Sequence, residues 1–253
     1  MKLYHKIIGQ GTTIVILHGL FGMLDNWMTI GKQLAKNYQV ILVDHRNHGK
    51  SPHSQEISFE LYANDLKELL DDLNIDRAYI MGHSMGGKTA MYFATKHPKR
   101  TLGMISIDMG AHKYMKGNHN EIFGAVLSID LSKYKRRAEV DKKLSEKIPN
   151  LQVRQFLLKN LSRGKLEYSW KANFQVLHDK YDALRMAVPK ESYFGGASLF
   201  IRGGSSPYIR DNDFDFVKSI FTNATLETIE GAGHWVHAEK PKELLFIVED
   251  FLE

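Results

Sequence analysis

Residues 82–89 read Gly82-His83-Ser84-Met85-Gly86-Gly87-Lys88-Thr89, between an apolar run that ends at Met81 and a helical pattern over residues 88–96. A serine on a tight turn from strand to helix needs neighbours without bulky side chains, and the three glycines meet this need. The backbone amides at the start of the helix favour a developing oxyanion. The pattern therefore predicts that Ser84 is a nucleophile held on a strained turn, with the Met85 amide as an oxyanion donor.

The same eight residues also satisfy the phosphate-loop pattern G-x-x-x-x-G-K-[ST], and Asp108 after an apolar run resembles a second NTPase motif. Two other motifs favour a hydrolase, His18-Gly19-Leu20-Phe21-Gly22 and Gly231-Ala232-Gly233-His234-Trp235. Neither has a role in an NTPase. In a hydrolase, the amide of Leu20 or Phe21 completes the oxyanion hole and His234 is the general base. A phosphate loop also usually follows the first strand of its sheet, whereas Ser84 follows about the fourth.

Short β-branched runs alternate with helical patterns, which predicts a mostly parallel sheet flanked by helices. Ser58 is expected to cap one helix and Pro241 to begin the last. The expected strands are residues 12–17, 39–43, 77–81, 103–107, 197–201 and 224–229.

The strand pattern stops between residues 111 and 188, where Lys-rich helical patterns take over. The sequence thus predicts an α/β core of residues 1–110 and 189–253 with an all-helical cap of residues 111–188. Because ligands bind at the carboxyl edge of open α/β sheets, this cap is expected to cover the site as a lid.

With these motifs in this order, the chain resembles the α/β-hydrolase superfamily over essentially its whole length. Residues 44–51, Asp44-His45-Arg46-Asn47-His48-Gly49-Lys50-Ser51, match a D-x-R-x-x-G-x-S segment whose role in that superfamily is structural. Together with the motifs around Leu20 and Ser84, this segment resembles small bacterial esterases and their mitochondrial relatives. The resemblance implies hydrolysis of short acyl esters and, in some members, of acyl-CoA thioesters.

The acid of the triad departs from the common superfamily pattern, which places an aspartate shortly after the strand at residues 197–201. Ser206 stands near that position. The resemblance implies that Asp108, at the end of the neighbouring strand, orients His234 instead. Asp211 and Asp213 remain as alternatives.

Composition adds a charge pattern and several exclusions. Residues 111–185 carry a net charge of +8, and the rest of the chain carries −3. The charge suggests either solvated helix faces or attraction of an anionic substrate such as acyl-CoA. The chain has no cysteine, and the polar start of the sequence lacks the apolar stretch of a signal peptide, so we expect a cytoplasmic protein. The loop histidines His45, His48 and His53 suggest a turn more than a metal site.

The sequence therefore predicts a serine carboxylesterase or thioesterase that forms an acyl-enzyme on Ser84, without cofactor or metal. Its expected partner is a small acyl ester or thioester, with no nucleic acid and no membrane. Two other functions stay open: a Ser-His-Asp enzyme that cleaves a C–C bond or eliminates a carboxylate, and a receptor that binds ligand without turnover.

Overall fold

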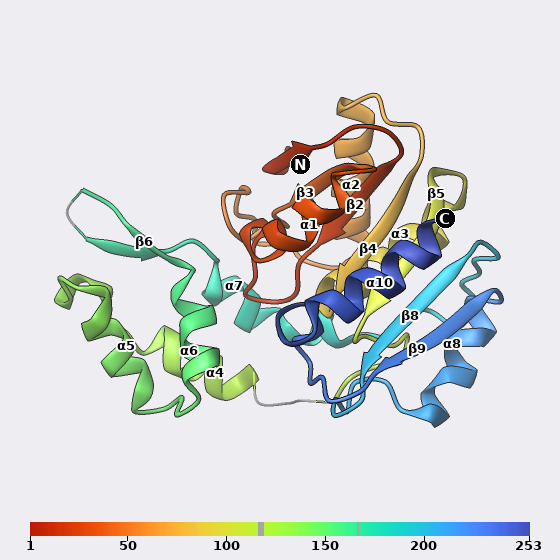
Figure 1. Cartoon of the computed structure of the whole chain (residues 1–253). Helices are drawn as coiled ribbons and strands as arrows, with labels where there is room; N and C mark the ends of the chain where they lie inside the picture. The colour runs from red at the N-terminus through yellow and green to blue at the C-terminus, as the bar shows by residue number, and fades with distance from the viewer. Residues whose placement is uncertain (116–118, 166) are drawn as a thin grey trace.

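The computed structural model describes residues 1–115, 119–165 and 167–253, and its core is a seven-stranded sheet (Figure 1). The strand order is β1-β3-β2-β4-β5-β8-β9, and every neighbouring pair is parallel except β1 with β3. The strands are β1 (His5–Ile8), β2 (Thr13–Leu17), β3 (Gln39–Val43), β4 (Ala78–His83), β5 (Thr101–Ile107), β8 (Ser198–Gly203) and β9 (Ala224–Ile229).

All six predicted strands are confirmed, with ends that differ by at most two residues. The sequence analysis missed β1, a four-residue antiparallel strand at the sheet edge. Its residues are only partly buried, so it lacks the continuous apolar run that marks the inner strands. The inner strand β2, by contrast, is buried at all five positions.

Helices cover both faces of the sheet. On one face, α1 (Met28–Leu34) and α10 (Pro241–Leu252) pack against the sheet, and on the other lie α2 (Phe59–Asp72), α3 (Met85–Lys96) and α8 (Phe214–Ile220). Short helical turns complete the core: η1 (Leu24–Trp27), η2 (Pro98–Arg100), η5 (Asp211–Asp213) and α9 (Val236–Glu239).

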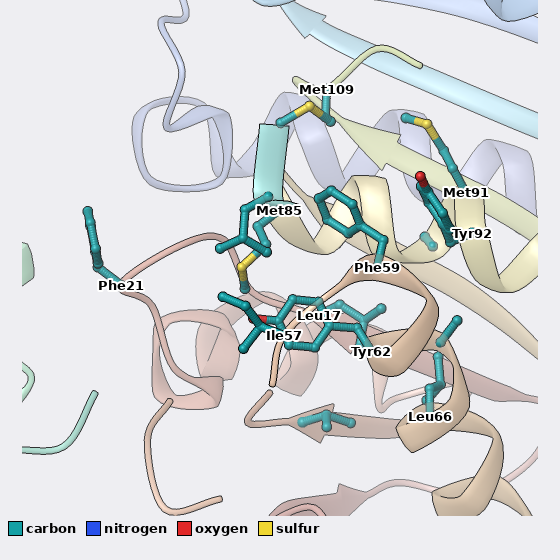
Figure 2. Packing of buried hydrophobic residues seen from close by; sticks show 14 of the residues in the cluster. Leu17, Phe21, Ile57, Phe59, Tyr62, Leu66, Met85, Met91, Tyr92 and Met109 are labelled. Atoms are coloured by element: carbon teal, nitrogen blue, oxygen red, sulfur yellow. The ribbon is translucent and has the colours of Figure 1, made fainter. Parts of the chain in front are cut away.

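Two predicted helix starts are confirmed. The Ser58 hydroxyl accepts a hydrogen bond from the Leu61 amide at 3.1 Å and caps α2, and Pro241 is the first residue of α10. Aromatic stacking joins α2 to α3, since the rings of Phe59 and Tyr92 lie 5.2 Å apart, and Met85 packs near them (Figure 2).

Of the predicted insertion of residues 111–188, the part over residues 119–163 lies beside the sheet, on the left of Figure 1. The expectation that this insertion is all-helical is wrong, because β6 (Leu161–Arg163) and β7 (Tyr168–Trp170) pair as an antiparallel hairpin. Three-residue strands are too short to give a clear alternating pattern, although Gly164 and the spacing of Tyr168 and Trp170 are consistent with a hairpin. The remaining elements are α4 (His119–Leu127), η3 (Leu131–Lys133), α5 (Arg137–Ser145), α6 (Leu151–Leu158), α7 (Phe174–Asp179) and η4 (Tyr181–Arg185).

The two connections between this cap and the core run side by side. The amide of Tyr114 donates to the carbonyl of Arg185 at 2.9 Å, and the amide of Val188 donates to the carbonyl of Ala111 at 2.8 Å. The outgoing and returning segments therefore support each other at the carboxyl end of β5. Within the described ranges, no helix has the length and apolar character needed to span a membrane.

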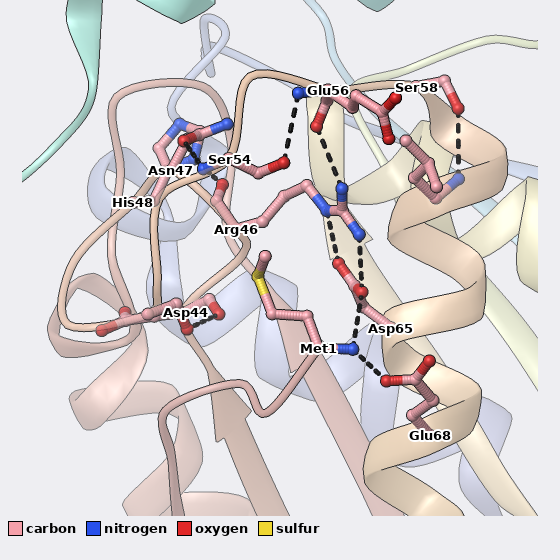
Figure 3. A network of polar contacts seen from close by, with 12 residues as sticks. Met1, Asp44, Arg46, Asn47, His48, Ser54, Glu56, Ser58, Asp65 and Glu68 are labelled. Atoms are coloured by element: carbon pink, nitrogen blue, oxygen red, sulfur yellow. Dashed lines mark hydrogen bonds and ion pairs between the residues drawn. The ribbon is translucent and has the colours of Figure 1, made fainter.

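Polar contacts hold the loop after β3 rigid (Figure 3). Asp44 accepts from the amides of Leu24 and Lys50 at 2.7 and 2.8 Å. Arg46 makes a bidentate ion pair with Asp65 of α2, with nitrogen–oxygen distances of 2.6 and 2.7 Å, and both side chains are buried. Breaking a buried pair of this kind by removing one partner costs about 3–5 kcal/mol. The segment thus has the structural role that the family resemblance implied.

Two buried histidines join this loop to residues 18–22. His48 Nδ1 donates to the carbonyl of Arg46, and its Nε2 accepts from the amide of Phe21 at 3.3 Å. His18 Nδ1 donates to the carbonyl of Gly19, and its Nε2 accepts from the amide of His45 at 3.1 Å. Both rings must be neutral to accept these bonds. Burial favours the same form, lowering the pKa of His18 to about 4 and that of His48 to about 3.

From the lowered pKa values of His18 and His48 we predict that the protein loses stability in mild acid. Between about pH 6.5 and pH 4 the unfolded chain binds protons at both residues and the folded chain does not, so the free energy of unfolding falls as pH is lowered. At pH 5 the loss should be on the order of 2 kcal/mol per histidine relative to pH 8. Urea denaturation at a series of pH values measures this slope. His48→Gln should flatten it, and an equal slope in wild type and variant would contradict the assignment to His48.

Candidate active site

Ser84 lies on the turn between β4 and α3, in a backbone conformation that side chains rarely adopt. Its φ is 53° and its ψ is −119°, and such a residue stores about 1–3 kcal/mol of strain. The chain passes so tightly here that a Cβ on Gly82 would lie 2.1 Å from the carbonyl oxygen of Gly86. A Cβ on Gly86 would lie 2.3 Å from the carbonyl oxygen of Leu17. Both glycines are therefore required by the close approach of backbone, as the sequence predicted.

His234, on the loop after β9, lines the same cavity as Ser84 and contacts Asp108. Its Nδ1 lies 2.6 Å from Asp108 Oδ2, so Nδ1 carries the proton and Nε2 keeps a lone pair. Asp108 directly follows β5, is completely buried and also accepts from the amide of Gly203 at 3.1 Å. In the described part of the chain no hydrogen bond joins the Ser84 hydroxyl to His234, a contact that in enzymes without substrate is often long.

The two alternative acids lie elsewhere. Asp211 pairs with Arg202 at 2.6 Å and its side chain is 84% exposed. Asp213 accepts from the amide of Arg210 at 3.0 Å. Among the described residues neither of them contacts His234, whereas Asp108 bonds it directly, so the geometry favours Asp108 as the candidate acid.

The lysine of the phosphate-loop interpretation does not face an open loop. Lys88 is buried, and its Nζ donates to the carbonyl of His112 at 2.7 Å. Burial without a carboxylate partner holds the pKa of Lys88 well below its usual range. The side chain thus supports the segment that leaves the core towards the cap.

The sequence left two backbone amides, those of Leu20 and Phe21, as partners for the Met85 amide in an oxyanion hole. One of the two is already hydrogen-bonded. The amide of Phe21 donates to His48, so it cannot also serve an oxyanion. Leu20 lines the cavities at Ser84, and Met85 is the first residue of α3, whose amide has no acceptor one turn earlier. Leu20 and Met85 are therefore the candidate donors.

Sequence analysis did not assign roles to three neighbours of the Asp108–His234 pair. The hydroxyl of Ser206 donates to Asp108 Oδ2, and His83 Nε2 donates to the carbonyl of His234 at 2.7 Å. The ring of Tyr208 stacks on that of His234. In the sequence, Ser206 is marked only as the residue near the position where the superfamily commonly has an aspartate. No spacing rule singles out His83 or Tyr208.

Two cavities meet at Ser84. The larger, of about 500 Å³, lies between the ends of β5 and β8 and the returning cap segment, with walls that include Met109, Leu184 and Tyr208. The smaller, of about 70 Å³, lies beneath α4 and α6, with walls that include Phe156 and His234. Leu20 belongs to both. An ester bound at Ser84 can therefore extend in two directions.

Positive charge lines the larger cavity. Lys113 and Arg210 are exposed residues of its lining, and Arg185 lies buried in its wall. One carboxylate, Asp213, belongs to the same lining. Among the residues outside the gaps at 116–118 and 166, no cluster of three or more His, Cys, Asp or Glu side chains could hold a metal ion.

Known proteins are similar to this chain over nearly its whole length. The family model for the alpha/beta hydrolase fold matches residues 12–241. The chain is 36% identical over 243 residues to "Esterase YbfF" of Escherichia coli (strain K12), covering 96% of this chain and 94% of that protein. It is 33% identical over 258 residues to "sn-1-specific diacylglycerol lipase ABHD11" of Mus musculus, covering 98% of this chain and 84% of that protein.

Among solved structures, "Marine microorganism esterase" superposes with a TM-score of 0.96 and 39% identity, covering 99% of each chain. The sheet order, the turn at Ser84 and these matches lead to one conclusion. The chain belongs to the α/β-hydrolase fold family.

Proposed function

We propose that this chain is a serine carboxylesterase and thioesterase that works through an acyl-enzyme on Ser84. One observation carries the proposal: the strained turn places Ser84 on the cavity wall that His234 also forms, and His234 is bonded to the buried Asp108. The family and its esterase and lipase relatives make the chain an ester-hydrolysing enzyme.

The reaction begins when Ser84 Oγ attacks the carbonyl carbon of the ester. His234 Nε2 takes the hydroxyl proton, while Asp108 stabilises the imidazolium that forms. The amides of Leu20 and Met85 hold the oxyanion. His234 then gives its proton to the leaving oxygen or sulfur, which departs as alcohol or thiol and leaves the acyl group on Ser84. A water molecule, deprotonated by His234, releases the acid and restores the serine.

The cavities support short-to-medium acyl substrates. The larger one has mostly apolar walls from residues such as Met109 and Leu184 and can hold a chain of several carbons. Lys113 and Arg210 at its side favour an anionic group on the substrate, as in an acyl-CoA thioester. Most of the basic residues of α5 lie farther away, at the outer end of the cap in Figure 1, and can act only through the long-range field.

The first prediction from this mechanism concerns the nucleophile. A fluorophosphonate probe should label Ser84 and no other residue, because among the described residues Ser84 is the one serine or threonine in the cavity wall that also holds His234. Ser84→Ala should abolish both labelling and hydrolysis of p-nitrophenyl esters. Wild-type activity in Ser84→Ala would refute the mechanism, and a single turnover by the native protein would identify a ligand receptor instead.

The second prediction concerns the acid. Asp108→Asn should lower kcat by roughly 10³-fold or more, because the imidazole can then adopt the wrong tautomer. Asp211→Asn, whose side chain is exposed and remote from His234, is the matched control and should be nearly silent. Steady-state kinetics on folded variants measure both losses of kcat. A larger loss in Asp211→Asn than in Asp108→Asn would mean that the acid lies after β8 and not after β5.

The third prediction concerns charge. At low ionic strength an acyl-CoA should be hydrolysed with a higher kcat/KM than a neutral ester of equal acyl length. The advantage should shrink several-fold between about 0.01 M and 0.5 M salt, as the Debye length falls from roughly 30 Å to a few Å. Lys113→Gln with Arg210→Gln should remove most of the advantage.

The matched control is the double variant Lys142→Gln with Lys143→Gln, which removes the same charge from α5 at the outer end of the cap. It should have a much smaller effect. If both substrates respond equally to salt, or if the two double variants behave alike, the positive lining has no part in substrate choice.

A further inference from the structure

Tyr208 makes the closest ring contact of His234 among the described aromatic pairs. The two ring centroids lie 4.0 Å apart and the planes are inclined by 15°, so the phenol ring covers one face of the imidazole. Tyr208 comes from the loop after β8 and also lines the larger cavity. It therefore stands between the general base and the space that receives substrate.

The backbone of Tyr208 is held from two sides. Its carbonyl accepts from the Tyr114 hydroxyl at 2.6 Å, and that hydroxyl in turn accepts from the amide of Gly110 at 2.7 Å. Its amide lies 3.4 Å from Ser206 Oγ, the group that bonds Asp108. The ring is thus placed by the same segment that contacts the acid. In the described residues, the phenol hydroxyl of Tyr208 itself has no hydrogen-bond partner.

The carboxylate of Glu239 accepts from the amides of Gly233 and Trp235, on either side of His234, at 2.6 and 3.3 Å, and three further histidines lie near by. Burial lowers the pKa of His119 to about 4 and that of His237 to about 3, and it lowers the pKa of His83 well below 6.5. Burial also raises the pKa of Tyr208, which keeps its ring neutral. Asp108 contacts the imidazole at Nδ1. Tyr208 covers one face of the imidazole ring.

We propose that Tyr208 is a positioning residue for His234: its ring keeps the imidazole in the plane that Asp108 sets and stabilises the imidazolium formed when Ser84 gives up its proton. The negative face of an aromatic ring attracts a cation, and the contact is stronger where water is excluded. The inference rests on the proposed function, because the imidazolium exists only while His234 acts as base.

The test compares Tyr208→Phe with Tyr208→Leu. The leucine variant loses the ring face, so kcat/KM should fall roughly threefold to thirtyfold, and the acid limb of its pH profile should move about 0.5–1.5 units lower. Both effects have one cause, since the ring favours the protonated base. The phenylalanine variant keeps the face and loses a hydroxyl without partner, so it should remain close to wild type in both measurements.

Tyr181→Leu is the matched control, because Tyr181 lines the same cavity without stacking on His234. It should change KM and leave the acid limb in place. Thermal melting and fluorophosphonate labelling confirm that each variant is folded.

Two results would overturn the inference: a loss of rate in Tyr208→Leu without movement of the acid limb, or an equal loss in Tyr208→Phe. If Tyr208→Leu does not fold, Tyr208→Trp takes its place beside Tyr208→Phe. Both variants keep a ring face, so the acid limb of their pH profiles must stay where it is in the wild type, and movement of that limb in either one contradicts the inference. Failure of the proposed function is distinct, because it would appear as hydrolysis by Ser84→Ala.

Discussion

A carboxylate with no exposure to solvent, Asp108, is the charge around which this site is arranged. Burying an ionised carboxylate costs several kcal/mol unless donors replace the lost water. Three donors do so here: the Gly203 amide, the Ser206 hydroxyl and His234 Nδ1. Two of these come from β8 and the loop that follows it. The orientation of the base thus depends on how β5 and β8 are paired.

The same pairing explains how the proposed acid, Asp108, can stand on a different strand from the common position. β5 and β8 are parallel neighbours, so their carboxyl ends lie side by side and either can present a group to the loop after β9. Asp108 directly follows β5. If an aspartate also stood at position 206, two carboxylates would face one imidazole, and one of them would have to be protonated. Ser206 instead donates a hydrogen bond to Asp108 Oδ2, the oxygen that His234 also contacts, and adds no competing charge.

Sequence patterns were sufficient for the sheet, for the turn at Ser84 and for the choice of a hydrolase, because these depend on local features. Continuous apolar runs, glycines at fixed spacing and a histidine on a glycine-rich loop each leave a short-range signal. The edge strand β1 and the hairpin β6–β7 left almost none, since short, half-exposed strands have little periodicity. The choice between Leu20 and Phe21 could not be made from the sequence. It depends on His48, which follows 27 residues after Phe21 and meets it only in the folded chain.

Among the described non-glycine residues with positive φ, three lie where the chemistry is proposed, and the other two, Asn47 and Asn74, are asparagines, which adopt this conformation more readily. Phe21, Ser84 and Asp108 all have positive φ, at 62°, 53° and 49°, and all three lie just past the carboxyl ends of strands. Each conformation costs about 1–3 kcal/mol and survives only if its surroundings hold it. For Ser84 and Asp108 the support is an extension of the sheet, since their amides donate to the carbonyls of Ile107 and Ile201 at 3.0 and 2.7 Å. For Phe21 it is the neutral ring of His48. The sheet therefore stabilises the proposed nucleophile and acid through the same bonds that continue its ladder. The loop proposed to hold the oxyanion depends instead on an uncharged histidine, so it is the part of the site that protonation would disturb first.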